Sequence, residues 1–135
     1  MKAYTDIEQS KRLAEILPAE NADQTWERIA IAGENLGAPI EMQYRHNKGI
    51  PFQYYTWSGM PCWSLAALLD ILESELYFED VDEDYQLNIC KDGTCWYVSY
   101  VNKFDTASII EETSSEELVD CCFEMILKLK ERNLL

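Results

Sequence analysis

The sequence predicts an α+β fold, in which an antiparallel sheet of about four to five strands is packed by helices. Segments near 25–45 and 85–101 alternate apolar and polar residues around turn residues, which is typical of β-hairpins. Segments 62–72 and 115–132 repeat apolar residues at helical spacing, and we expect them to be a central and a C-terminal helix. A chain of 135 residues suits one compact core, so residues 1–135 are expected to form a single domain.

The first 18 residues predict a modest amphipathic helix on the outside of the fold. Thr5 and Glu8 have the spacing of a capping box, in which the Thr5 hydroxyl accepts from the Glu8 amide and the Glu8 side chain reaches back. Pro18 is expected to end the helix, because proline disfavours helical geometry in the residue before it.

The first hairpin is expected to have strands near 25–32 and 39–45, separated by a glycine-containing turn. The same segment has some helical spacing around Trp26, and the hairpin is the favoured interpretation. A third strand is predicted over 52–57 from its aromatic and threonine content.

The central helix is predicted from four leucines at the i, i+3, i+4 and i+7 spacing of one helix face. They are Leu65, Leu68, Leu69 and Leu72. Alanines beside this stripe keep the helix thin, so we expect it to be buried against the sheet.

The second hairpin is centred on Asp92-Gly93, a pair suited to a type I′ turn. A two-residue loop at this position brings Cys90 opposite Cys95. Alternation along both strands then gives one core face, made of Leu87, Ile89, Trp96 and Val98.

The C-terminal helix is expected to begin near Ser114 or Ser115. Acidic residues in its first turn and basic residues in its last turn both suit the helix dipole. Its apolar stripe is Leu118, Cys122, Met125, Ile126 and Leu129.

The composition is strongly acidic, with 25 Asp and Glu against 11 Lys and Arg and a formal charge of −14. This balance argues against direct binding to nucleic acid or to an anionic membrane, because both require a cationic surface. Residues 1–60 carry eight acids and six bases, whereas residues 61–135 carry seventeen acids and five bases. The charge therefore belongs almost wholly to the second half of the chain.

Two tracts of the second half contain acids with no intervening base. The first is Glu73, Glu75, Glu79, Asp80, Asp82, Glu83 and Asp84, and the second is Asp105, Glu111, Glu112, Glu116, Glu117, Asp120 and Glu124. A solvated face that keeps the protein in solution explains them, and a surface for a basic partner explains them as well.

The sequence contains no signal peptide and no apolar run long enough to cross a membrane, so a cytoplasmic location is expected. Five cysteines cannot all pair internally, and reduced thiols are the default in that compartment.

Cys62 and His46 are the only pair that suggests nucleophilic catalysis. Cys62 is expected at the start of the central helix, where the helix field lowers a thiol pKa, and His46 is the only histidine available as a base. No nucleophile signature surrounds Cys62, and a buried small apolar side chain is the simpler interpretation. The sequence therefore identifies no catalytic residue.

No metal or cofactor is predicted. The cysteines lack zinc-site spacing, and the triad Asp80, Asp82 and Asp84 departs from a calcium loop, which requires glycine at the position of Tyr85. Cys90 and Cys95 have the expected separation of a strained cross-strand disulfide, or they stay as two reduced thiols.

The segment 52–57 is rich in Tyr and Trp, which are enriched at protein interfaces. A strand buries only one face, so some of these side chains are expected at the surface beside the acidic half. The predicted interaction residues are Tyr54, Tyr55, Trp57, Glu79, Asp80, Asp82, Glu83 and Asp84.

Three segments resemble small proteins encoded in gut Bacteroidales genomes and their phages or mobile elements. They are 61–69, the hairpin strands 85–89 and 96–100, and 119–129, with 7–18 resembling the opening helix of those proteins. These are packing motifs, and the family has no established activity. The resemblance implies a mobile-element or phage origin and supplies no catalytic residue.

The leading hypothesis is a non-enzymatic accessory protein that binds a protein partner through its acidic surface, which would suit a basic partner. The first alternative is a nucleic-acid mimic or nuclease inhibitor, related in purpose to anti-restriction or immunity proteins, whose carboxylates imitate phosphates. The second is a cysteine hydrolase that uses Cys62 and His46.

Overall fold

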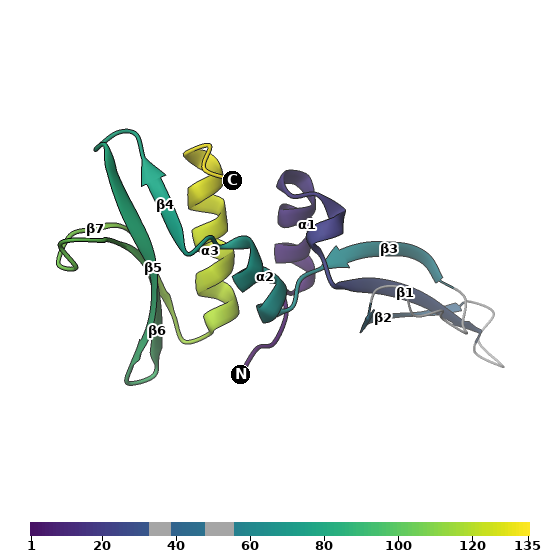
Figure 1. Ribbon diagram of the computed structural model, residues 1–135. Coiled ribbons are helices and arrows are strands. Elements are labelled where there is room, and N and C mark those ends of the chain that lie inside the picture. The colour runs from purple at the N-terminus through teal and green to yellow at the C-terminus, as the bar shows by residue number, and fades with distance from the viewer. Residues whose placement is uncertain (33–38, 48–55) are drawn as a thin grey trace. The chain divides into compact units, whose positions relative to one another are not determined.

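The computed structural model describes residues 1–32, 39–47 and 56–135, and the side chains of residues 27–59 lie outside this description (Figure 1). The predicted α+β class is confirmed, with three α-helices and antiparallel sheets in the described residues. The strands belong to two sheets, of three and four strands. The chain divides into two compact units, Tyr4–Ser64 and a second unit of Met1–Ala3 with Leu65–Leu135. The single domain stays a prediction.

The unit Tyr4–Ser64 holds one helix and a sheet of strand order β2-β1-β3. Its elements are α1 (Ile7–Ile16), the 3-10 turn η1 (Ala19–Asn21), β1 (Gln24–Ala32), β2 (Pro39–Asn47) and β3 (Thr56–Cys62). The predicted hairpin of β1 and β2 is confirmed, with Gln24 opposite Asn47 and Ala32 opposite Pro39. The strand predicted over 52–57 meets β3 only at its last two residues, because 48–55 lie outside the described residues.

Helix α1 begins one residue later than the predicted capping box. Asp6 is the N-cap: its carboxylate accepts from the Gln9 amide at 2.8 Å, and the Gln9 side chain accepts from the Asp6 amide at 3.1 Å. The prediction of Thr5 as the cap is wrong, because its hydroxyl is fully buried and bonds to Ser10 at 2.7 Å and to the Trp63 amide at 3.1 Å.

The second unit is a four-stranded sheet of order β4-β5-β6-β7 with two helices. Its elements are α2 (Leu65–Ile71), β4 (Glu75–Phe78), β5 (Glu83–Asp92), β6 (Cys95–Asn102), β7 (Ile109–Ser115) and α3 (Leu118–Glu131). Helix α3 packs against β6, β7 and α2, and Figure 1 shows it along one face of the sheet. Strands β4 and β7 were not predicted, and β7 delays the start of the C-terminal helix to Leu118.

The C-terminal helical pattern correctly identifies a buried face, and the central leucine pattern does so in part, since Leu65 and Leu69 are only half-buried. All five residues of the predicted α3 stripe are buried, and so are Leu68 and Leu72 of the central leucine stripe. Helix α2 is shorter than predicted, since it begins at Leu65, and Cys62 ends β3 instead of starting a helix. No helix in the described ranges is both long enough and apolar enough to span a membrane.

The β5–β6 hairpin has a different register from the predicted one. Asp92 pairs with Cys95, so the two-residue loop is Gly93 and Thr94. In this loop only Gly93 has a positive φ, of 63°. Glycine at the first central position is the pattern of a type II′ turn, whereas a type I′ turn needs positive φ at both positions.

The shift separates the two cysteines that were expected to face each other. Cys90 lies opposite Tyr97, which makes Cys95 its diagonal neighbour at about 7–8 Å between Cα atoms, beyond ordinary disulfide reach. The predicted cross-strand juxtaposition of Cys90 and Cys95 is therefore wrong, and both thiols are free. The residues predicted to share a face still share it, because each β5 residue lies opposite a β6 residue two positions further along than predicted. Of this predicted core face, Val98 is fully buried, and Leu87, Ile89 and Trp96 are half-buried.

Candidate functional site

Glu79, Asp80 and Asp82 of the first acidic tract lie in the turn between β4 and β5, and acids in and beside this turn line two cavities. Glu79 and Asp80 line one cavity, and Asp82, Glu83 and Asp84 line the other. Asp82 has a left-handed backbone with a φ of 53°, a conformation that Asp tolerates better than most residues. The turn thus divides the predicted acidic site into two environments.

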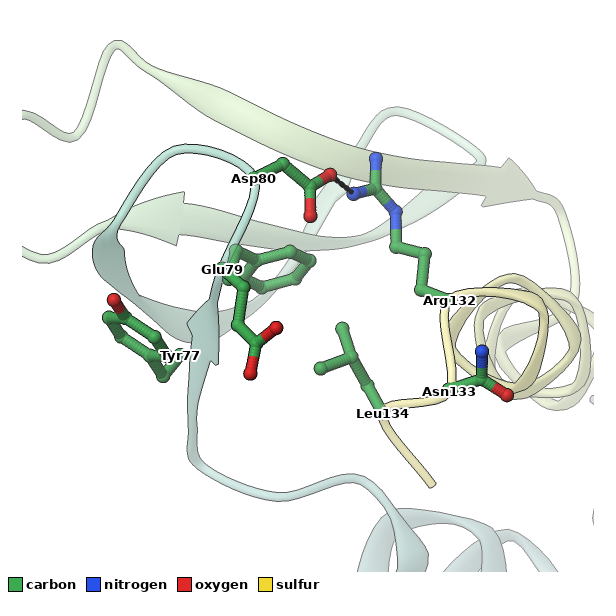
Figure 2. A pocket seen from close by; sticks show the side chains of 7 residues that line it. Tyr77, Glu79, Asp80, Arg132, Asn133 and Leu134 are labelled. Atoms are coloured by element: carbon green, nitrogen blue, oxygen red, sulfur yellow. Dashed lines mark hydrogen bonds and ion pairs between the residues drawn. The ribbon is translucent and has the colours of Figure 1, made fainter.

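The first space, here called the arginine cavity, has a volume of about 370 Å³ between the β4–β5 turn and the end of α3. Arg132 donates from Nη1 to Asp80 at 2.9 Å and from Nε to Glu111 at 2.8 Å, and its guanidinium carbon lies 5.3 Å from the centre of the Phe78 ring. Figure 2 shows Asp80 and Arg132 on one side of the cavity, with Glu79 facing Leu134 across it. The negative charge of the arginine cavity is therefore partly compensated by Arg132.

The second space, here called the acidic cavity, has a volume of about 460 Å³ between the β4–β5 turn and the β6–β7 loop. Among the described residues, its lining contains no Lys, Arg or His. It contains four carboxylates, those of Asp82, Glu83, Asp84 and Asp105. Phe104 also lines the cavity and is 90% exposed. Carboxylates beside an exposed ring favour an organic cation.

Asn102 holds the two sides of the acidic cavity together. Its amide nitrogen donates to Glu83 at 2.5 Å, and its amide oxygen accepts from the backbone of Phe104 at 2.9 Å and of Asp105 at 3.0 Å. Asn102 is only 6% exposed, so these hydrogen bonds are shielded from water and are stronger than exposed ones. They therefore order the β6–β7 loop. The backbone of Phe104 is therefore held in an ordered loop beside the acidic turn.

Tyr77 ties β4 to the same turn. Its hydroxyl donates to the Asp82 carboxylate, and this bond is the largest cause of a raised pKa at Tyr77, because it favours the protonated phenol. Tyr77 also lies opposite Asp84 in the β4–β5 ladder. An aromatic side chain thus borders the acidic turn on the β4 side.

No family model, curated protein or solved structure matches the chain. The candidate site accordingly rests on its own geometry and charge.

Three of the seven acids in the second acidic tract bond to groups of their own unit: Glu111, Glu117 and Asp120. Lys2 donates from its backbone amide to Glu117 at 2.6 Å and from its ammonium group to Asp120 at 2.8 Å. Glu111, already bonded to the arginine of the first cavity, also lies 3.5 Å from the Lys128 ammonium. In contrast, no ion pair is formed by the carboxylates of the acidic cavity in the described part of the chain.

The predicted aromatic half of the interaction site lies outside the described side chains. Tyr54 and Tyr55 fall within residues 48–55, and Trp57 belongs to β3 with its side chain outside the description. Phe104 is an exposed aromatic residue that the sequence patterns did not predict as part of the site. The available signal was Asn102 followed by Asp105, because Asn and Asp side chains bond to the backbone two residues on and so favour a turn after a strand.

Cys62 lies in a buried environment. Its side chain is fully buried, and Sγ is 3.6 Å from the Thr5 carbonyl oxygen. Its proposed base, His46, belongs to β2, whose side chains are not described, and β1 separates the two strands by about 10 Å of backbone spacing. The predicted position of Cys62 at the start of the central helix is wrong, because Cys62 ends β3 and α2 begins at Leu65.

Proposed function

We propose that this protein is a non-enzymatic accessory protein that binds a basic protein partner through the acidic cavity. The observation that carries the proposal is the contrast between the two sides of one turn. Asp80 is compensated by Arg132, whereas Asp82, Asp84 and Asp105 share a cavity with no basic lining residue. Uncompensated carboxylates of this kind accelerate and orient association with a positively charged surface.

Exposed side chains of the acidic cavity, β4 and the β4–β5 turn support a protein as the partner. Phe104 is 90% exposed, and Tyr77 and Val81 are 47% and 45% exposed. Exposed apolar groups next to charge suit an interface with an apolar centre and a polar rim. We further propose a cytoplasmic location and a mobile-element or phage origin, on the basis of the sequence.

The nucleic-acid mimic is a second candidate with weaker support. Such a mimic needs a long array of carboxylates that a basic enzyme can reach. Glu111 and Asp120 pair with basic side chains of this chain, and Glu117 accepts from the Lys2 backbone amide, so three acids of that array already have partners. The acidic cavity alone offers a compact surface, which favours a short basic segment over a nuclease active site.

Affinity capture with two variants of equal charge tests the proposal. The site variant carries Asp82→Asn, Asp84→Asn and Asp105→Asn. The control carries Glu116→Gln, Glu124→Gln and Glu131→Gln, three exposed positions outside the cavity lining. We expect a basic protein captured by the wild type to be lost with the site variant and kept with the control. Equal retention by both variants would refute the proposed function.

A further inference from the structure

The arginine cavity shows how this fold holds a guanidinium group. Arg132 lies over the Phe78 ring at 5.3 Å and bonds to Asp80 and Glu111 at 2.9 and 2.8 Å. One aromatic face and two carboxylates from different elements therefore complete a site for arginine. This combination uses both the ring quadrupole and the planar donor fork of the guanidinium.

The acidic cavity has the same kinds of group and lacks the cation. Phe104 provides a ring that is 90% exposed, and the β4–β5 turn and β6–β7 loop provide carboxylates from two elements. Asn102 already fixes the backbone of Phe104 and Asp105 relative to β5, so this loop does not have to be ordered when a ligand binds.

We propose that the acidic cavity binds an arginine side chain supplied by a partner protein. This inference rests on the proposed function and specifies the chemistry of its partner. The guanidinium stacks on Phe104 and pairs with carboxylates among Asp82, Asp84 and Asp105. Arginine is favoured over lysine, because a planar, weakly hydrated fork stacks on a ring and bonds to two oxygens at once.

Exposed apolar side chains in and beside the β4–β5 turn and the β6–β7 loop indicate what flanks this arginine. Four of the five large apolar side chains that are exposed in the described residues lie in or beside the two loops: Tyr77, Val81, Phe104 and Ile109. Val81 precedes Asp82 in the turn, and Ile109 begins β7 directly after the loop. A segment with apolar residues next to its arginine covers these groups while its charge meets the carboxylates.

Two capped peptides test the proposal by NMR titration of the labelled full chain. They are acetyl-Leu-Arg-Leu-amide and acetyl-Leu-Lys-Leu-amide. We expect the arginine peptide to bind at least about threefold more tightly and to shift amide signals of residues 82–84 and 104–108. Phe104→Ala should weaken the arginine peptide by about three- to fivefold. The exposure of Phe104 makes this variant compatible with folding.

The charge variants separate failure of this inference from failure of the proposed function. Equal affinity for the two peptides together with no effect of Phe104→Ala would overturn the arginine site. The proposed function would still stand if the triple Asn variant alone lost its protein partner. Equal weakening of the arginine peptide by the triple Asn and triple Gln variants would also overturn the site, because the attraction would then depend on net charge alone.

Discussion

Arg132 donates to Asp80 at 2.9 Å and so connects the end of α3 to the β4–β5 turn, 52 residues earlier in the chain. The same guanidinium bonds to Glu111 and lies over Phe78. The pairing divides an acidic tract that is continuous in the sequence. Asp80 is compensated within the chain, whereas Asp82, Glu83 and Asp84 form no ion pair in the described residues.

Replacement of Arg132 tests how much this connection stabilises the unit. We expect Arg132→Met to lower the free energy of unfolding by about 1–2 kcal/mol, because it removes the ring contact and a partner of Glu111, whose side chain is only 18% exposed. The Asp80 pair contributes least, since the Asp80 side chain is 69% exposed. Urea denaturation measures the change.

Lys130→Met is the matched control for this substitution. Lys130 lies on the same last turn of α3 and is exposed, so we expect a change below about 0.5 kcal/mol. An equal loss in the two variants would contradict the importance of the Arg132 contacts and would indicate a general effect of charge at the end of the helix.

Local periodicity was enough to predict the elements that build the core of the second unit. The α3 stripe identifies its buried face correctly, because burial on one side imposes a period on the sequence. The alternation predicted along β6 does not appear in its burial, because residues 98–102 are all buried. Strands β4 and β7 escaped prediction for a physical reason. Strand β4 has only four residues, and β7 ends in polar residues whose pairing is decided by β6.

The candidate site depended on distances that no local pattern encodes. Asp82 and Asp105 lie in separate loops, and both line the acidic cavity because β5 and β6 run antiparallel between them. The same holds for Asp80, whose compensation by Arg132 requires α3 to pack on the sheet. The sequence could predict acidic residues, but not which of them were already paired.

Thr5 offers a test of the polar contacts in the unit Tyr4–Ser64. Its buried hydroxyl bonds to Ser10 and accepts from the Trp63 amide, so Thr5→Val leaves two buried polar groups without partners. We expect this variant to lose about 2–4 kcal/mol of stability. Thr5→Ser keeps the hydroxyl and should lose only about 1 kcal/mol for the missing methyl group. A more stable Val variant in thermal unfolding would contradict the bonding role.

Gly93 tests the turn register of the β5–β6 hairpin. Its positive φ of 63° disfavours other residues, although an added Cβ meets no neighbouring atom within 4 Å. We expect Gly93→Ala to cost about 1 kcal/mol and Gly93→Asn to cost less, since Asn tolerates this conformation. Asp92→Gly should bring no gain, because Asp92 belongs to β5. Stabilisation by Asp92→Gly in urea denaturation would support the predicted type I′ turn.

The buried thiols of α3 predict a loss of stability at alkaline pH. Burial raises the pKa of Cys121 to about 11 and that of Cys122 to about 12, from an ordinary value of 9.0. Above pH 9 the unfolded chain releases these protons while the folded chain keeps them, so the unfolded state binds fewer protons and stability falls as pH rises. The loss should extend from about pH 9 to about pH 12.

Two core substitutions in α3 separate this effect from simple loss of packing. Cys122→Ala removes a buried thiol, so the dependence of unfolding free energy on pH should become shallower by up to one proton. Val119→Ala also truncates a fully buried side chain of α3, but it keeps both thiols. We therefore expect it to lower stability at every pH and to leave the slope unchanged. Denaturation series between pH 8 and pH 11 with equal slopes for the two variants would show that buried thiol ionisation does not control the alkaline limit of this fold.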